Sequence, residues 1–104
     1  MKVKMVFVEQ TMSGDNVVAA EEFVVIYEAL QLTAENESEL VEWCGGTLSK
    51  ARHNWTAIDI PTPLGTKRAN LHDWIVKDPL GRFYPCTTEA FELVYRPVED
   101  DDDV

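Results

Sequence analysis

Apolar and polar positions alternate at the start of the chain, over residues 2–9, where the apolar set on one parity is Val3, Met5 and Phe7. A period of two places successive side chains on opposite faces of a strand, so this segment predicts a half-exposed strand. Residues 13–16, with the sequence Ser-Gly-Asp-Asn, have the composition of a turn. We therefore expect the chain to reverse direction there.

The apolar stretch that follows is compatible with two structures. Residues 17–20, Val-Val-Ala-Ala, suit the start of a helix, whereas residues 23–27 are rich in β-forming side chains. We interpret the second part as a long strand that reaches Leu32. Its length and apolarity predict a central strand that is covered on both faces.

A short helix is predicted over residues 37–44. Asn36 is placed to cap its first turn, and Glu39 at the third helical position completes a capping-box pattern. Leu40 and Cys44 lie four residues apart and share one helical face. The glycine pair at residues 45–46 then ends the helix, because glycine readily adopts the left-handed closing conformation.

The second half of the chain predicts two hairpins. The first has a strand that begins near Trp55 and ends at Pro61, and Leu64-Gly65 turns the chain back. The second turns at residues 78–81, Asp-Pro-Leu-Gly, which is the composition of a type I turn with a glycine bulge. The register that this turn sets pairs Asp78 with Arg82, Val76 with Tyr84, and Trp74 with Cys86.

A second short helix is predicted after the last strand. Thr87 is its N-terminal cap, Phe91, Val94 and Tyr95 form its apolar face, and Pro97 stops it. With these elements, residues 1–98 are expected to form a single α+β domain: an antiparallel sheet of about five strands with two short helices packed on it.

Composition and charge narrow the functional classes. The 104 residues are 45% hydrophobic and 27% charged, as in an ordinary globular domain. Nineteen acidic against nine basic residues give a net charge of −10, which argues against a nucleic-acid partner. No apolar run approaches the roughly 18 residues of a membrane span, and the N-terminal run is too short for a secretory signal. We therefore expect no membrane association.

The charge is unevenly distributed. Residues 1–48 have nine acidic and two basic residues, whereas residues 49–98 are slightly basic. Residues 99–104 form an acidic tail with five adjacent acids, which we expect to be disordered because it has no apolar group to bury. The alternative is a tail that docks on a basic partner surface.

The residues that usually carry chemistry are sparse. Cys44 and Cys86 have no Cys-x-x-Cys spacing and are expected to be reduced, buried thiols. His53 and His72 lack neighbours at metal-ligand spacing. A Cys-His-Asp arrangement is permitted by composition but is not indicated by any spacing. We therefore expect no metal, no cofactor and no enzyme activity.

Two groups are candidates for ligand binding. The basic residues Lys67, Arg68, Lys77 and Arg82 fall on the two neighbouring hairpins, where they could converge on a phosphate or carboxylate, although exposed cross-strand ion pairs are the commoner explanation for such residues. Among the three tryptophans, Trp55 lies in a polar stretch and is the one expected to be exposed.

The sequence also resembles a known group of proteins. Residues 73–75 are Asp-Trp-Ile, residues 81–86 are Gly-Arg-Phe-Tyr-Pro-Cys, and residues 91–92 are Phe-Glu. In this order they resemble a widespread family of small bacteriophage proteins of unassigned function. The resemblance covers residues 25–98, with His72 in place of a usual glycine and Arg82 in place of a usual glutamate. It implies a phage origin and an order of elements, but no catalytic residue.

These observations lead to one functional hypothesis. We expect a bacteriophage accessory protein that acts in the host cytoplasm by non-catalytic binding. Its partner is expected to be a host protein with a basic surface, for instance a component of a host pathway or defence that it inhibits or modulates. Two alternatives remain open: a protein that sequesters a nucleotide-like small molecule, and a minor virion component. Each is compatible with a homo-oligomer.

Overall fold

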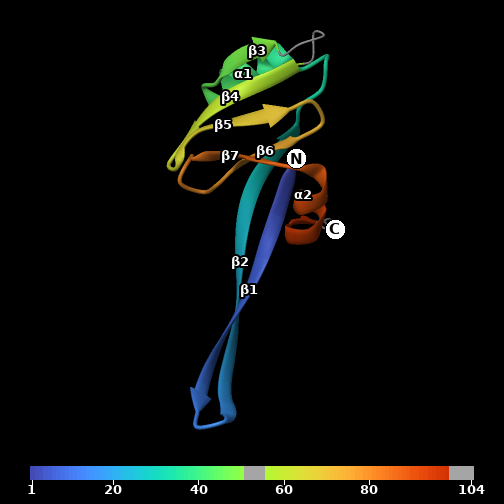
Figure 1. Ribbon diagram of the computed structural model, residues 1–104. Helices are drawn as coiled ribbons and strands as arrows, with labels where there is room; N and C mark the ends of the chain where they lie inside the picture. The colour runs from blue at the N-terminus through green and yellow to red at the C-terminus, as the bar shows by residue number, and fades with distance from the viewer. Residues whose placement is uncertain (51–55, 99–104) are drawn as a thin grey trace.

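In a computed structural model that describes residues 1–50 and 56–98, the chain folds as an α+β protein with two antiparallel sheets and two helices (Figure 1). The five-stranded sheet has the order β7-β6-β2-β1-β8 and is built from β1 (Lys2–Ser13), β2 (Asn16–Gln31), β6 (Trp74–Lys77), β7 (Phe83–Cys86) and β8 (Arg96–Pro97). The three-stranded sheet has the order β3-β4-β5 and is built from β3 (Thr47–Lys50), β4 (Thr56–Thr62) and β5 (Gly65–Asn70). The helices are α1 (Glu37–Cys44) and α2 (Thr88–Val94).

Each face of the five-stranded sheet is covered near its centre by a different element. On one face, α2 packs Phe91 against Val3, Ala29 and Val76. On the other face, α1 and the three-stranded sheet enclose a second cluster: Leu32, Leu40, Cys44, Ile58, Ile60, Ala69 and Ile75. Because neighbouring residues of β2 point to opposite faces, Ala29 belongs to the first cluster and Leu30 packs on the second.

The hairpin of β6 and β7 forms in the predicted register. Val76 lies opposite Tyr84 and Trp74 opposite Cys86. The backbone N–H of Asp78 donates to the carbonyl of Arg82 at 2.9 Å, and Gly81 adopts a φ of 84°. The Asp-Pro-Leu-Gly turn therefore determines this part of the sheet from local chemistry alone.

Both predicted helices are present, with two corrections. The backbone N–H of Ala90 donates to the Thr87 hydroxyl at 3.2 Å, which confirms the cap of α2, and Phe91 is buried. Val94, however, is 43% exposed, because α2 meets the sheet through Phe91 and Tyr95, which lie four residues apart on another side of the helix.

The capping-box prediction at α1 is wrong. The side chain of Asn36 accepts a hydrogen bond from the backbone N–H of Thr33 and donates one to the carbonyl of Gln31, so it fixes the connection from β2 instead of capping the helix. The predicted C-terminus is confirmed, since Gly45 has a φ of 66°. A Cβ at Gly46 would lie 2.7 Å from Cγ2 of Ile58, so glycine allows α1 to approach β4 closely.

The predicted α+β fold is confirmed, with a five-stranded antiparallel sheet and two short helices, but the first of the two hairpins lies in a separate three-stranded sheet. β4 and β5 pair with β3, a short strand that the sequence pattern did not reveal. Ile58 and Ile60 of β4 face the five-stranded sheet and bury its second face. Pro61 does not end β4, which continues to Thr62, where the turn into β5 begins.

The long β1–β2 hairpin is the most conspicuous feature of the molecule. In Figure 1 its two strands leave the body of the protein side by side and end far from both helices. The principal dimensions of the molecule, 56 × 37 × 24 Å, reflect this projection. The turn at residues 13–16 is confirmed, since β1 ends at Ser13 and β2 begins at Asn16. The prediction that β2 is covered on both faces is wrong for its first half, which lies in the projection.

Candidate functional site

The projecting part of the hairpin, residues 5–26, is called the arm here. β1 pairs with β8 only at Val3 and Lys4, and β2 pairs with β6 only from Glu28 onward. Beyond these positions the two strands pair with each other and with no further strand that the structure describes. An isolated two-stranded ribbon is only marginally stable in water, so the arm depends on what covers it.

Large apolar side chains are exposed along the arm. Their exposed fractions run from 42% to 60%, and the set is Val6, Phe7, Val8, Met12, Val17, Val18, Phe23, Val24 and Ile26. Together these residues leave on the order of 700 Å² in contact with water, taking about 150–200 Å² for one fully exposed residue. Because exposed apolar surface of this extent commonly marks a binding site, the arm is a candidate interaction surface.

The arm has two faces of different composition, because the register alternates side chains between them. The α2 face continues the sheet face that α2 covers, and its residue pairs are Met5–Val25, Phe7–Phe23 and Glu9–Glu21. The α1 face continues the sheet face that α1 covers, and its residue pairs are Lys4–Ile26, Val6–Val24 and Val8–Glu22. On each face an apolar pair is followed, one step toward the tip, by acidic residues: Glu9 and Glu21 on the α2 face and Glu22 on the α1 face.

The α2 face combines an aromatic pair with an acidic pair. Phe7 lies opposite Phe23, and each residue is 44% exposed. One step toward the tip, Glu9 lies opposite Glu21, and both are exposed. A hollow of about 490 Å³ is lined by Phe7, Val8, Glu9 and Phe23. The arrangement offers an apolar contact beside two like charges.

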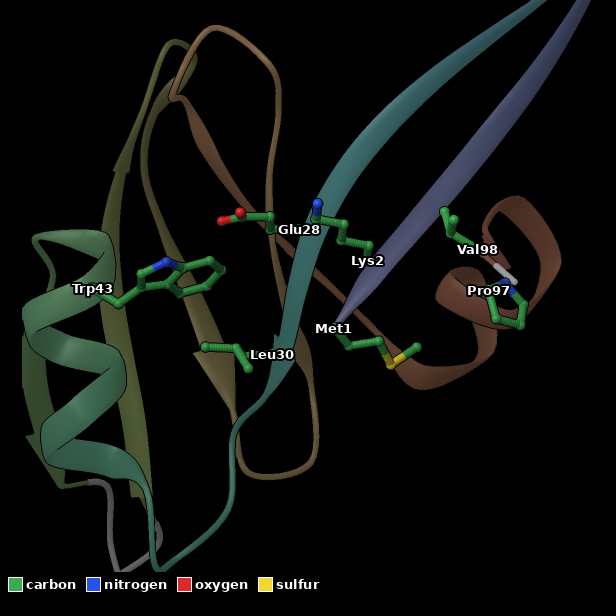
Figure 2. Close-up of a pocket in the computed structure, with 7 residues that line it drawn as sticks. All are labelled: Met1, Lys2, Glu28, Leu30, Trp43, Pro97 and Val98. Carbon is green, nitrogen blue, oxygen red and sulfur yellow. The ribbon is translucent and has the colours of Figure 1, made fainter. Parts of the chain in front are cut away.

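The α1 face ends in a pocket where the arm meets the body. The pocket has a volume of about 670 Å³ and is lined by Met1, Lys2, Glu28, Leu30, Trp43, Pro97 and Val98. Figure 2 shows Trp43 and Leu30 on one side, Pro97 and Val98 on the other, and Lys2 and Glu28 between them. The Trp43 ring packs edge-to-face on Phe83, with 5.0 Å between ring centroids, so its position is fixed by the core. The pocket is therefore a largely apolar hollow with one basic and one acidic residue.

Most of the four basic residues that are candidates for ligand binding contact a residue of their own hairpin. Nε of Arg68 lies 2.9 Å from Asp59 on the neighbouring strand, and its guanidinium holds the pKa of that carboxyl below its usual value. Nε of Arg82 lies 2.7 Å from Asp78. Lys77 lies 5.7 Å from the centre of the Phe83 ring. These contacts favour the cross-strand interpretation over a shared anion site.

Lys67 is exposed on β5 and points to the opposite side of the sheet from Arg68, because adjacent strand residues alternate. Trp55 lies outside the described residues. Trp74 stacks on Phe91 with 4.1 Å between ring centroids and packs against the cluster of Val3, Ala29 and Val76.

The titratable groups in the core of the body include two thiols and a tyrosine. Cys44 and Cys86 are free thiols, and burial raises the pKa of each, so both are protonated near neutral pH. Burial also raises the pKa of Tyr95 to about 12. Within residues 1–50 and 56–98, no three His, Cys, Asp or Glu side chains gather as metal ligands would. The exposed arm and the pocket at its base are therefore the stronger functional candidates.

Sequence reasoning missed the arm, although a signal for it is present. Residues 5–26 include four acidic residues and no basic one, and Val6, Val8, Val24 and Ile26 make the second parity of both strands apolar as well. An apolar run on both parities predicts a buried strand, but here it belongs to a ribbon that the body does not reach.

Comparison with known proteins gives no family. No family model, no curated protein and no solved structure matches the chain. In the part of the chain that the structure describes, no helix is long and apolar enough to cross a membrane.

Proposed function

We propose that this chain is a bacteriophage accessory protein that acts in the host cytoplasm by non-catalytic binding, and that its partner is a host protein with a basic surface. We assign the contact to the α2 face of the arm. The observation that carries this proposal is the exposed Phe7–Phe23 pair with Glu9 and Glu21 directly opposite each other beside it.

The acidic pair favours a basic partner. Like charges directly opposite on neighbouring strands destabilise a sheet, and the arm provides no basic residue of its own to offset them. A Lys or Arg of a partner placed between Glu9 and Glu21 would remove this repulsion. The pair is therefore more favourable in a complex than in the free arm.

The aromatic pair supplies the apolar part of the contact. Phe7 and Phe23 have few degrees of freedom to lose on binding, because each is held on a paired strand. Aromatic anchors at the centre of an interface with charged groups at the rim are the usual arrangement in protein–protein recognition. The net charge of −10 adds long-range attraction to a basic surface.

The test begins with affinity purification of the full chain from host extract and continues with the purified partner. We expect Phe7→Ser to weaken binding by at least about tenfold, the usual effect of removing an anchor. Glu21→Lys should weaken binding and reduce its dependence on salt. The matched control is Leu64→Ser, the same kind of change at a side chain that is 79% exposed in the turn between β4 and β5.

Two results would contradict the proposal. One is binding that Phe7→Ser and Leu64→Ser weaken equally, since the arm would then have no special role. The other is an affinity that stays the same from low to high salt, since a contact between an acidic arm and a basic surface must weaken as salt screens it.

The nucleotide-binding alternative has less support. The pocket beside Trp43 has one basic residue, Lys2, together with Glu28. A phosphate group would meet more repulsion there than at a site with several cations. A thermal-shift screen with nucleotides tests this alternative directly, since a ligand that binds only the folded protein raises its melting temperature.

A further inference from the structure

We propose that the α1 face of the arm is covered by a second copy of this chain, with the two arms antiparallel and Val6 and Val24 of each copy at the two-fold axis. This contact is separate from the proposed function, which uses the α2 face. The two faces of the ribbon would then each have an occupant.

The exposed area fits a dimer contact. The apolar residues on the α1 face are Val6, Val8, Met12, Val17, Val24 and Ile26, with exposed fractions of 42–60%. They present on the order of 500 Å², taking about 150–200 Å² per fully exposed residue. With the polar side chains between them, the face approaches the roughly 800 Å² per partner of a standard interface.

The order of charges along this face is self-complementary. From the base toward the tip, the pairs are Lys4–Ile26, Val6–Val24 and Val8–Glu22. A two-fold axis through the Val6–Val24 pair places the Val8–Glu22 pair of one copy on the Lys4–Ile26 pair of the other. Each Glu22 then comes within side-chain reach of Lys4 of the second copy. A parallel arrangement would instead bring Glu22 to the same level as its own equivalent.

The same arrangement gives the pocket at the base of the arm an occupant. The register of the arm shifts between Thr11 and Met12, and Met12 lies opposite Val17 near the tip. In the antiparallel arrangement the tip of one arm extends past Lys2 of the other copy toward Leu30 and Trp43. Met12 and Val17 would thus approach the pocket of about 670 Å³ beside Trp43.

A charge exchange tests the arrangement. We would measure the dissociation constant of the dimer by sedimentation equilibrium for the full chain and three variants at about 0.15 M salt, where distant charges are screened. We expect Lys4→Glu and Glu22→Lys each to raise that constant by about tenfold, because each replaces two symmetric attractions with repulsions. The combined exchange should restore it to within about threefold of the original.

The matched control is Glu21→Lys, which makes the same charge change one residue away on the opposite face of β2. We expect it to leave the dimer constant unchanged. A full chain that stays monomeric at about 100 μM would overturn the proposal. So would a dimer that the combined exchange fails to restore, or one that Glu21→Lys weakens as much as Glu22→Lys does. Because the readout is the oligomeric state alone, loss of host-protein binding by the Phe7→Ser variant does not affect it.

Discussion

Asp78 shows how a single side chain can fix a turn. Its carboxylate accepts hydrogen bonds from the backbone N–H groups of Leu80 at 3.0 Å and Arg82 at 2.8 Å, and from Nε of Arg82 at 2.7 Å. The side chain is 7% exposed. Burial alone would raise its pKa, but the hydrogen bonds from Arg82 and Leu80 together outweigh burial and lower it. The ionised form is therefore the one that the fold stabilises.

We expect Asp78→Ala to lower the free energy of unfolding by about 2–3 kcal/mol, because it leaves two backbone donors without their acceptor. Asp78→Asn keeps an acceptor and should cost less. Since the folded pKa lies below the unfolded value of about 3.9, the contribution of the charge is present above that pH and is lost as the pH falls. Urea unfolding at about pH 6 and pH 3 should therefore show a smaller pH effect in Asp78→Asn than in the original chain. Equal pH effects would contradict this assignment.

At the level of elements, the hairpins differ in what they depend on. β6 and β7 are joined by a turn that the sequence specifies, and their apolar side chains enter both core clusters. The arm has a turn at residues 13–16 that the sequence specifies. Its side chains lie beyond Val3 and Tyr27, toward the tip, and contribute to neither cluster. Local pairing thus forms the arm, whereas the body contributes nothing to its outer part.

This difference predicts that the outer arm can be removed without unfolding the body. We expect a chain in which Asn-Gly replaces residues 8–22 to keep its free energy of unfolding within about 1 kcal/mol, measured at a concentration where the full chain is monomeric. Phe91→Ala is the contrasting variant and should cost about 3–5 kcal/mol, because Phe91 is 5% exposed in the core. A shortened chain that loses cooperative unfolding would show that the arm supports the body.

At the level of the whole molecule, acidic charge and exposed apolar surface coincide on the arm. No basic residue occurs between Lys4 and Lys50, a region that includes the whole of the arm and α1. The described basic residues of the second half are in the body, where two of them form ion pairs. The molecule therefore consists of a body in which acidic and basic residues offset each other and an arm that is both acidic and apolar.

A dimer through the arms makes thermal stability depend on concentration. Because association favours the folded state by mass action, we expect the melting temperature of the full chain to rise by a few degrees over a hundredfold increase in protein concentration. The Glu22→Lys variant should show a smaller rise. A melting temperature that does not change with concentration in the full chain would contradict a dimer of folded copies.

The sequence by itself determined the elements that are set by local chemistry. Residues 37–44 form the predicted helix, Thr87 caps the second one, and the turn at residues 78–81 fixes the register of its hairpin. In each case the deciding interaction lies within a few residues along the chain, so composition and spacing are enough to predict it.

Only the tertiary structure decided what each strand covers. Val24 and Ile26 have the same apolar pattern as the buried Ile58 and Ile60, yet the first two are exposed on the arm and the last two lie in the core. Burial depends on whether another element reaches the strand, and that is a property of the whole fold. The pocket beside Trp43 likewise arises from contacts between segments that are distant in the sequence, since Lys2, Glu28, Trp43 and Pro97 all line it.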